Sequence, residues 1–130
     1  MSKKIEICVI DDEQIVCERL RPELEKRDYS VETFVDSTAA LKRLSEKKFD
    51  VLITDVKMAG PSGLDLMRHV KTYSHETRVI IITGFATVET AKEAMKGGAV
   101  DFIAKPFRLS AILDLVGKIS EEIRGAAEDS

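Results

Sequence analysis

Five side chains that could carry out chemistry stand where apolar stretches of the sequence end. Taken alone, each has an ordinary structural explanation, because Asp and Thr often close turns or cap helices. Taken together, they would bring three carboxylates, one hydroxyl and one ammonium group to one place. They are Asp11 and Asp12 after residues 5–10, Asp55 after 51–54, Thr83 at the end of 78–83, and Lys105 after 100–104.

The apolar stretches predict five β-strands that alternate with five helices. Val51–Thr54 is mostly apolar and β-branched, which is typical of a central strand covered on both faces. Apolar residues three or four positions apart predict the helices between the strands. Short connections in this order favour a parallel sheet with helices on both faces. The expected strands are 5–10, 29–34, 51–54, 78–83 and 100–104, and the last helix is expected over about 109–124.

The carboxyl ends of parallel strands lie at one edge of a sheet, where ligands bind in open α/β folds. Three carboxylates packed together repel one another unless a cation lies among them, and hard oxygen ligands suit Mg²⁺. Lys105 and Thr83 would supply donors for an anion. Such a site suits phosphoryl transfer, with one aspartate acting as the nucleophile.

Composition limits the other possibilities. The 130 residues are 44% hydrophobic and 33% charged, which fits one globular domain. The net charge of −3 gives no basic footprint, so we expect no direct nucleic-acid binding. We also expect no membrane span, no signal peptide and a cytoplasmic location. Cys8 and Cys17 are too few for a disulfide framework or a zinc site.

The residues at the strand ends also resemble a known family, the receiver domain of two-component response regulators. The matching residues are Asp11-Asp12, Asp55, Thr83-Gly84 and Lys105-Pro106-Phe107, with Met58 and Gly63 in the loop after Asp55. The resemblance covers residues 5–124. It implies a doubly wound, flavodoxin-like α/β fold with a five-stranded parallel sheet in the order 2-1-3-4-5 and five helices. Residues 1–124 would form one receiver domain, and 125–130 a polar tail or the start of a linker.

The resemblance also implies a role for each site residue. Asp55 would accept a phosphoryl group from a sensor histidine kinase or a phosphotransfer protein. The chain would thus catalyse its own phosphorylation and dephosphorylation without being a conventional enzyme. Mg²⁺ would be bound by Asp12, Asp55 and the backbone carbonyl of Lys57, and mainly through water by Asp11. Lys105 would bond the phosphoryl oxygens, Thr83 and Phe102 would form the switch, and the Lys105–Pro106 bond would be cis.

The face formed by the last two helices and the fifth strand would carry the output, which we expect to be related to transcription, or would form a homodimer. Charged side chains on this face are candidate contacts: Lys92, Glu93, Lys96, Asp101, Lys118, Glu121 and Glu122. Two positions that flank the site and tune phosphoryl lifetime in the family are occupied by Lys57 and Phe85. Ala59 stands where the family usually has proline, which weakens the expectation of a rigid loop after Asp55.

Three alternatives fit the sequence less well. A haloacid-dehalogenase-like phosphatase would need an Asp-x-Asp motif on its first strand, and a flavodoxin-like cofactor binder would need a phosphate-cradling loop there. A degenerate, purely structural receiver is the third alternative. Residues 83–91 and 101–107 look like receivers of the nitrogen-regulation type, which usually precede an ATPase domain and a DNA-binding domain. The sequence does not decide between an excised receiver and a single-domain regulator.

Overall fold

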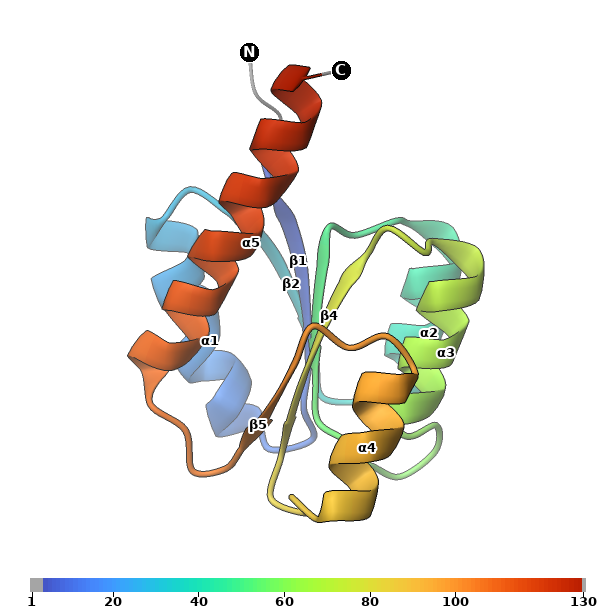
Figure 1. Ribbon diagram of the computed structural model, residues 1–130. Helices are drawn as coiled ribbons and strands as arrows, with labels where there is room; N and C mark the ends of the chain where they lie inside the picture. The colour runs from blue at the N-terminus through green and yellow to red at the C-terminus, as the bar shows by residue number, and fades with distance from the viewer. Residues whose placement is uncertain (1–3, 130) are drawn as a thin grey trace.

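The computed structural model describes residues 4–129, in which five strands alternate with five helices (Figure 1). The order matches the prediction, although three strands begin one residue later than expected. The elements are β1 Glu6–Ile10, α1 Gln14–Lys26, β2 Ser30–Phe34, α2 Ser37–Glu46, β3 Val51–Thr54, α3 Gly63–Tyr73, β4 Arg78–Thr83, α4 Val88–Lys96, β5 Asp101–Ala104 and α5 Leu109–Asp129.

The strands form one parallel sheet in the order β2-β1-β3-β4-β5, which confirms the order implied by the resemblance. Ile10 of β1 pairs with Thr54 of β3, so these two central strands end level. The backbone N–H of Asp55 then donates to the carbonyl of Ile10 at 3.0 Å. At the other side of the site, the N–H of Lys105 donates to the carbonyl of Thr83 at 2.8 Å. The sheet therefore brings four strand ends to one edge.

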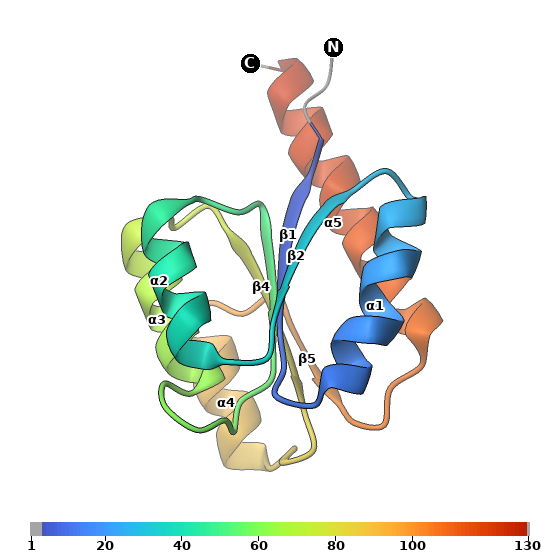
Figure 2. The ribbon, with the colours of Figure 1, turned by 180° about the vertical axis from the view of Figure 1, so that it is seen from behind.

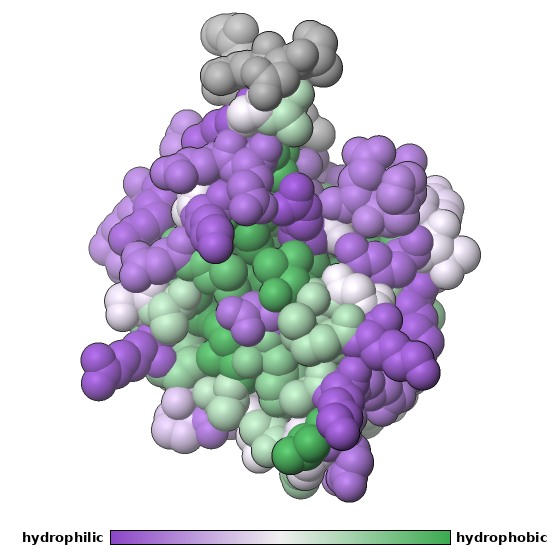
Figure 3. Space-filling view, in the orientation of Figure 1, coloured by the Kyte–Doolittle hydropathy of each residue, from purple (hydrophilic) through white to green (hydrophobic). Residues whose placement is uncertain are grey.

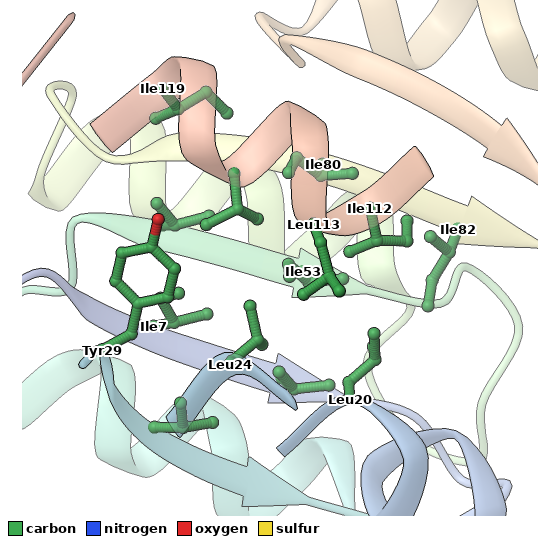
Figure 4. Close-up of a cluster of buried hydrophobic side chains, with 14 of the residues drawn as sticks. Ile7, Leu20, Leu24, Tyr29, Ile53, Ile80, Ile82, Ile112, Leu113 and Ile119 are labelled. Atoms are coloured by element: carbon green, nitrogen blue, oxygen red, sulfur yellow. The ribbon is translucent and has the colours of Figure 1, made fainter. Parts of the chain in front are cut away.

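Helices cover both faces of the sheet, with α1 and α5 on one side and α2, α3 and α4 on the other (Figures 1 and 2). Because successive side chains of a strand point to opposite faces, β1 contributes to two cores. Ile7 and Val9 join the core under α1 and α5, whereas Cys8 and Ile10 join the core under the other three helices. Figure 4 shows the first core, in which residues of α5 such as Ile112 lie over Ile53 and Ile80 of the sheet.

Side chains at three helix starts fix where the helices begin. Asp36 accepts from the N–H of Thr38 at the start of α2, and Thr87 accepts from the N–H of Thr90 at the start of α4. At the start of α3, Ser62 and Asp65 form a reciprocal capping box. Asp36 and Thr87 are residue types that commonly cap helices, whereas the box at Ser62 departs from the usual signature, which has Glu or Gln at the third helical position.

The last helix is longer than predicted. We expected it to end near Arg124, but α5 continues to Asp129 and projects past the rest of the domain (Figure 1). Gly125 costs a helix about 1 kcal/mol, yet the following alanines are strong helix formers and the helix passes through it. Residues 125–129 are thus helical, and the idea that they begin a linker stays a prediction. Within the described part of the chain, none of the helices combines the length and apolarity that a membrane crossing requires.

Candidate functional site

Three carboxylates meet at the carboxyl edge of the sheet. Asp11, Asp12 and Asp55 each place one oxygen within 4.8 Å of the others. Asp11 and Asp55 are buried, whereas Asp12 is exposed. One oxygen of each buried carboxylate is engaged by backbone, since Asp11 Oδ1 accepts from the N–H of Glu13 at 2.9 Å and Asp55 Oδ1 from that of Val56 at 2.7 Å. These bonds orient the second oxygen of each carboxylate.

The ammonium group of Lys105 bridges those second oxygens. Its Nζ lies 2.7 Å from Asp11 Oδ2 and 2.9 Å from Asp55 Oδ2, and the Lys105 side chain is only 13% exposed. The same Nζ lies 2.6 Å from Glu13 Oε1. Sequence reasoning predicted that Lys105 and the aspartates would meet, but it missed Glu13. The available signal was that Glu13 directly follows the Asp11-Asp12 pair.

The pKa values of Asp11 and Lys105 are both raised in this site, for different reasons. Burial raises the pKa of Asp11, and the nearby charge of Asp55 adds to that effect, while Lys105 opposes it. Burial alone would lower the pKa of Lys105, but its bonds to Asp11, Glu13 and Asp55 outweigh burial and raise it. The ammonium therefore stays charged at neutral pH and partly offsets the surrounding carboxylates.

The carboxylate cluster fits a small divalent cation. All its candidate ligands are hard oxygen atoms, and one of the three side chains faces water, which suits the partly hydrated coordination of Mg²⁺. Opposite ligands of an octahedral Mg²⁺ ion are about 4.2 Å apart, so a cluster spanning up to 4.8 Å needs only small side-chain shifts. Lys57 lies in the exposed loop after Asp55, and its carbonyl as a further ligand stays a prediction.

The two expected switch residues lie on neighbouring strands. Thr83 is fully buried at the end of β4, and its Oγ1 accepts from the N–H of Phe85 at 3.0 Å. Thr83 pairs with Ala104 of β5, so Phe102, two residues earlier, points to the same face of the sheet. Phe102 is partly buried and packs against the core under α2, α3 and α4.

The two positions expected to flank the site contact each other. Lys57 Nζ lies 4.1 Å from the centroid of the Phe85 ring, in a cation–π arrangement. The Phe85 side chain is otherwise largely exposed, at 53%. This contact joins the loop after β3 to the loop after β4.

The loop after Asp55 is held in place without proline at position 59. Ser37 Oγ donates to the carbonyl of Ala59 at 2.8 Å, and the N–H of Gly63 donates to the carbonyl of Val56 at 2.8 Å. Gly63 also lies against the backbone of Asp55, because a Cβ built on it would be 1.8 Å from the Asp55 carbonyl oxygen. The Lys105–Pro106 bond is cis, as the resemblance implied.

Comparison with protein families decides how this site is classified. A family model described as the response regulator receiver domain matches residues 7–117. The chain belongs to the response regulator receiver family. This membership favours a receiver domain of a two-component system over the phosphatase and the cofactor binder, as the sequence already did.

Relatives of this receiver domain include transcriptional regulatory proteins. ZraR of Klebsiella oxytoca is 34% identical over 105 residues, which cover 81% of this chain and 24% of ZraR. FixJ of Bradyrhizobium diazoefficiens is 37% identical over 117 residues, which cover 88% of this chain and 57% of FixJ. The chain thus corresponds to only part of each of these regulators.

Solved structures of receiver domains have the same fold. The beryllofluoride-activated NtrC4 receiver domain dimer is 33% identical with a TM-score of 0.83, covering 90% of this chain and 97% of that one. A response regulator from Burkholderia pseudomallei, solved with a phosphorylated aspartic acid, a calcium ion and citrate, is 30% identical with a TM-score of 0.80. The match covers 98% of this chain and 75% of that one.

Proposed function

We propose that this receiver domain accepts a phosphoryl group on Asp55 from a phosphohistidine of a sensor kinase or a phosphotransfer protein. The observation that carries the proposal is the contact of Lys105 Nζ with Asp55 Oδ2 at 2.9 Å, beside a carboxylate cluster that fits Mg²⁺. A related regulator from Burkholderia pseudomallei carries a phosphorylated aspartic acid with a calcium ion, which supports the same chemistry here.

In the proposed reaction, a carboxylate oxygen of Asp55 attacks phosphorus while the bond between phosphorus and the histidine nitrogen breaks, and that nitrogen keeps the electron pair. Mg²⁺ would be held by Asp12, Asp55 and the Lys57 carbonyl, and mainly through water by Asp11, and it would supply positive charge that offsets the phosphoryl oxygens. Lys105 would bond one of those oxygens, since its ammonium already lies on Asp55 Oδ2. The product is an acyl phosphate, and its later hydrolysis returns the free carboxylate. The chain would thus be a signalling protein that catalyses only its own modification.

The switch would use Thr83 and Phe102. The Oγ1 of Thr83 accepts from the N–H of Phe85, so its hydroxyl hydrogen is free to donate to a phosphoryl oxygen on Asp55. Movement of Thr83 toward that group would leave space that the Phe102 ring could fill. Phe102 has no hydroxyl group, so packing alone would stabilise the inward position. A partner would sense the change only through a difference in affinity for the two states.

The output surface would be the face of α4, β5 and α5. Figure 3 shows apolar side chains gathered on this face between α4 and α5, and the exposed apolar residues near it are Val88, Met95 and Val100. Two of the charged candidates are already engaged, since Glu93 pairs with Arg68 and Glu122 with Arg78. The apolar residues are therefore better candidates for partner contacts than those two charges.

We propose that the same face can join two copies of the chain after phosphorylation. The NtrC4 receiver domain is a dimer in its beryllofluoride-activated state, which supports the proposal. Size-exclusion chromatography with light scattering, with and without beryllofluoride, would measure the change in mass. A Met95→Glu variant should remain monomeric with beryllofluoride. A wild-type mass that is the same in both conditions would argue against this dimer.

The phosphoacceptor role can be tested by incubating the chain with Mg²⁺ and acetyl phosphate and measuring intact mass. One phosphoryl adduct is expected in wild type and none in Asp55→Asn. Asp114→Asn, which makes the same chemical change at an exposed position of α5, should still form the adduct. Absence of an adduct with every phosphodonor would favour the degenerate receiver, and an adduct that persists in Asp55→Asn would place the acceptor elsewhere.

A further inference from the structure

Glu13 makes a long-range side-chain contact with Lys105, although it lies at the start of a helix, where a side chain commonly caps the backbone. It is the residue before the first turn of α1, yet its side chain does not cap that helix. Instead, its carboxylate reaches Lys105, 92 residues away in the sequence, with Oε1 and Nζ 2.6 Å apart. Glu13 is itself 58% exposed, so burial of its own side chain does not explain this position.

The three carboxylates around Lys105 are not equivalent. Asp11 and Asp55 belong to the cluster that fits Mg²⁺, whereas Glu13 lies outside it. An ammonium group and a divalent cation compete for the carboxylates of Asp11 and Asp55, and Lys105 Nζ already contacts one oxygen of each. The carboxylate of Glu13 offers the ammonium a partner that the cation does not need.

We propose that Glu13 is a positioning residue that shares the Lys105 ammonium with Asp11 and Asp55 and so eases the displacement of that ammonium from their oxygens when Mg²⁺ binds. This inference rests on the proposed function, because it assigns Glu13 a part in preparing the same site. Glu13 also competes with an incoming phosphoryl group for Lys105. It should therefore favour cation binding and slow phosphoryl uptake once the cation site is full.

These opposite effects distinguish a positioning role from a structural one. In Glu13→Gln, Lys105 remains on Asp11 and Asp55, so the Kd for Mg²⁺ should rise about threefold, the size expected for an exposed ion pair. At saturating Mg²⁺, uptake from acetyl phosphate should instead become about threefold faster, because Lys105 is no longer shared with Glu13. A variant that merely loosened the fold would lose both affinity and rate.

The experiment is a Mg²⁺ titration followed by backbone amide chemical shifts, together with uptake rates measured by intact mass. Glu18→Gln is the matched control, because it removes another exposed carboxylate, which lies on α1 and accepts from Gln14 instead of contacting Lys105. Glu13→Gln is also made in a Lys105→Met background. There it should change the Kd no more than Glu18→Gln does, because no ammonium remains to be displaced.

Several results would overturn the inference. Equal Kd values for Glu13→Gln and Glu18→Gln would remove the link to Lys105, and so would an undiminished effect in the Lys105→Met background. A slower uptake rate in Glu13→Gln at saturating Mg²⁺ would contradict the competition with the phosphoryl group. If wild type itself neither bound Mg²⁺ nor formed an adduct, the proposed function would fail first, and the inference with it.

Discussion

Gly63 begins α3 directly against the residue proposed to be phosphorylated, which makes Gly63→Ala an informative substitution. The new Cβ would lie 1.8 Å from the carbonyl oxygen of Asp55 and 3.1 Å from the Cα of Val56. A carbon and an oxygen in contact are normally about 3.3 Å apart or more. The start of α3 or the backbone at Asp55 would therefore have to move by about 1.5 Å.

The free energy of unfolding should fall by about 1–4 kcal/mol. Forced overpacking costs about 1–3 kcal/mol, and about 1 kcal/mol is lost if the hydrogen bond from the Gly63 N–H to Val56 breaks. Alanine returns less than about 1 kcal/mol through its better helix propensity. A displacement of Asp55 by about 1 Å should also slow phosphoryl uptake by up to about a hundredfold.

Urea denaturation measures the stability change, and Gly117→Ala provides the matched control. Gly117 lies within α5, and a Cβ added there would meet nothing within 4 Å. The same substitution should therefore stabilise the protein by about 0.4–1 kcal/mol. The reasoning would be refuted if Gly63→Ala proved as stable as Gly117→Ala, or if its uptake rate were unchanged.

Three further substitutions test other parts of the structure. The bonds from Arg43 and Lys47 hold the pKa of Glu32 at about 2, below its usual 4.5. The stability that Glu32 contributes is therefore present above pH 4.5 and is lost as the pH falls toward 2. Glu32→Gln should be about 1–2 kcal/mol less stable than wild type at pH 7. Its urea midpoint should also change less than that of wild type between pH 4.5 and pH 2. Thr83→Ala should form the adduct in the intact-mass assay, but phosphorylation should no longer change its affinity for a partner; a shift equal to that of wild type would exclude the switch role. Phe85→Ala removes the ring beneath Lys57 and should shorten the half-life of the adduct about twofold to fivefold, whereas an unchanged decay would show that the ring does not shield it.

The central strands, and the meeting of the site residues at one edge of the sheet, were predictable because buried strands have a recognisable apolar, β-branched sequence. Val51–Thr54 is buried at every position, as its apolar, β-branched sequence indicated. The level ends of β1 and β3 then place Asp11 beside Asp55. The order of the strands, in contrast, came from the family resemblance, because periodicity does not reveal which strands are neighbours.

Other features depend on tertiary geometry that local patterns do not contain. The contact of Glu13 with Lys105 and that of Lys57 with Phe85 each join two loops, and the relative position of two loops follows only from the folded sheet. The end of α5 was misplaced because residues 125–130 were interpreted as a polar tail, whereas the helix continues to Asp129. The exposed apolar residues of α4 were overlooked because charges were expected to carry the output.

The separation of the site residues along the chain has a consequence for synthesis on the ribosome. Asp55 completes the carboxylate cluster, but Lys105 emerges only 105 − 55 = 50 residues later. At about 5–20 residues per second, the nascent chain holds the three aspartates for roughly 3–10 s before Lys105 is added. If β1 and β3 pair within that interval, counterions from the surrounding solution would relieve the repulsion among the carboxylates that Lys105 later relieves. The central strands would therefore pair more readily in a nascent chain when divalent cations are present.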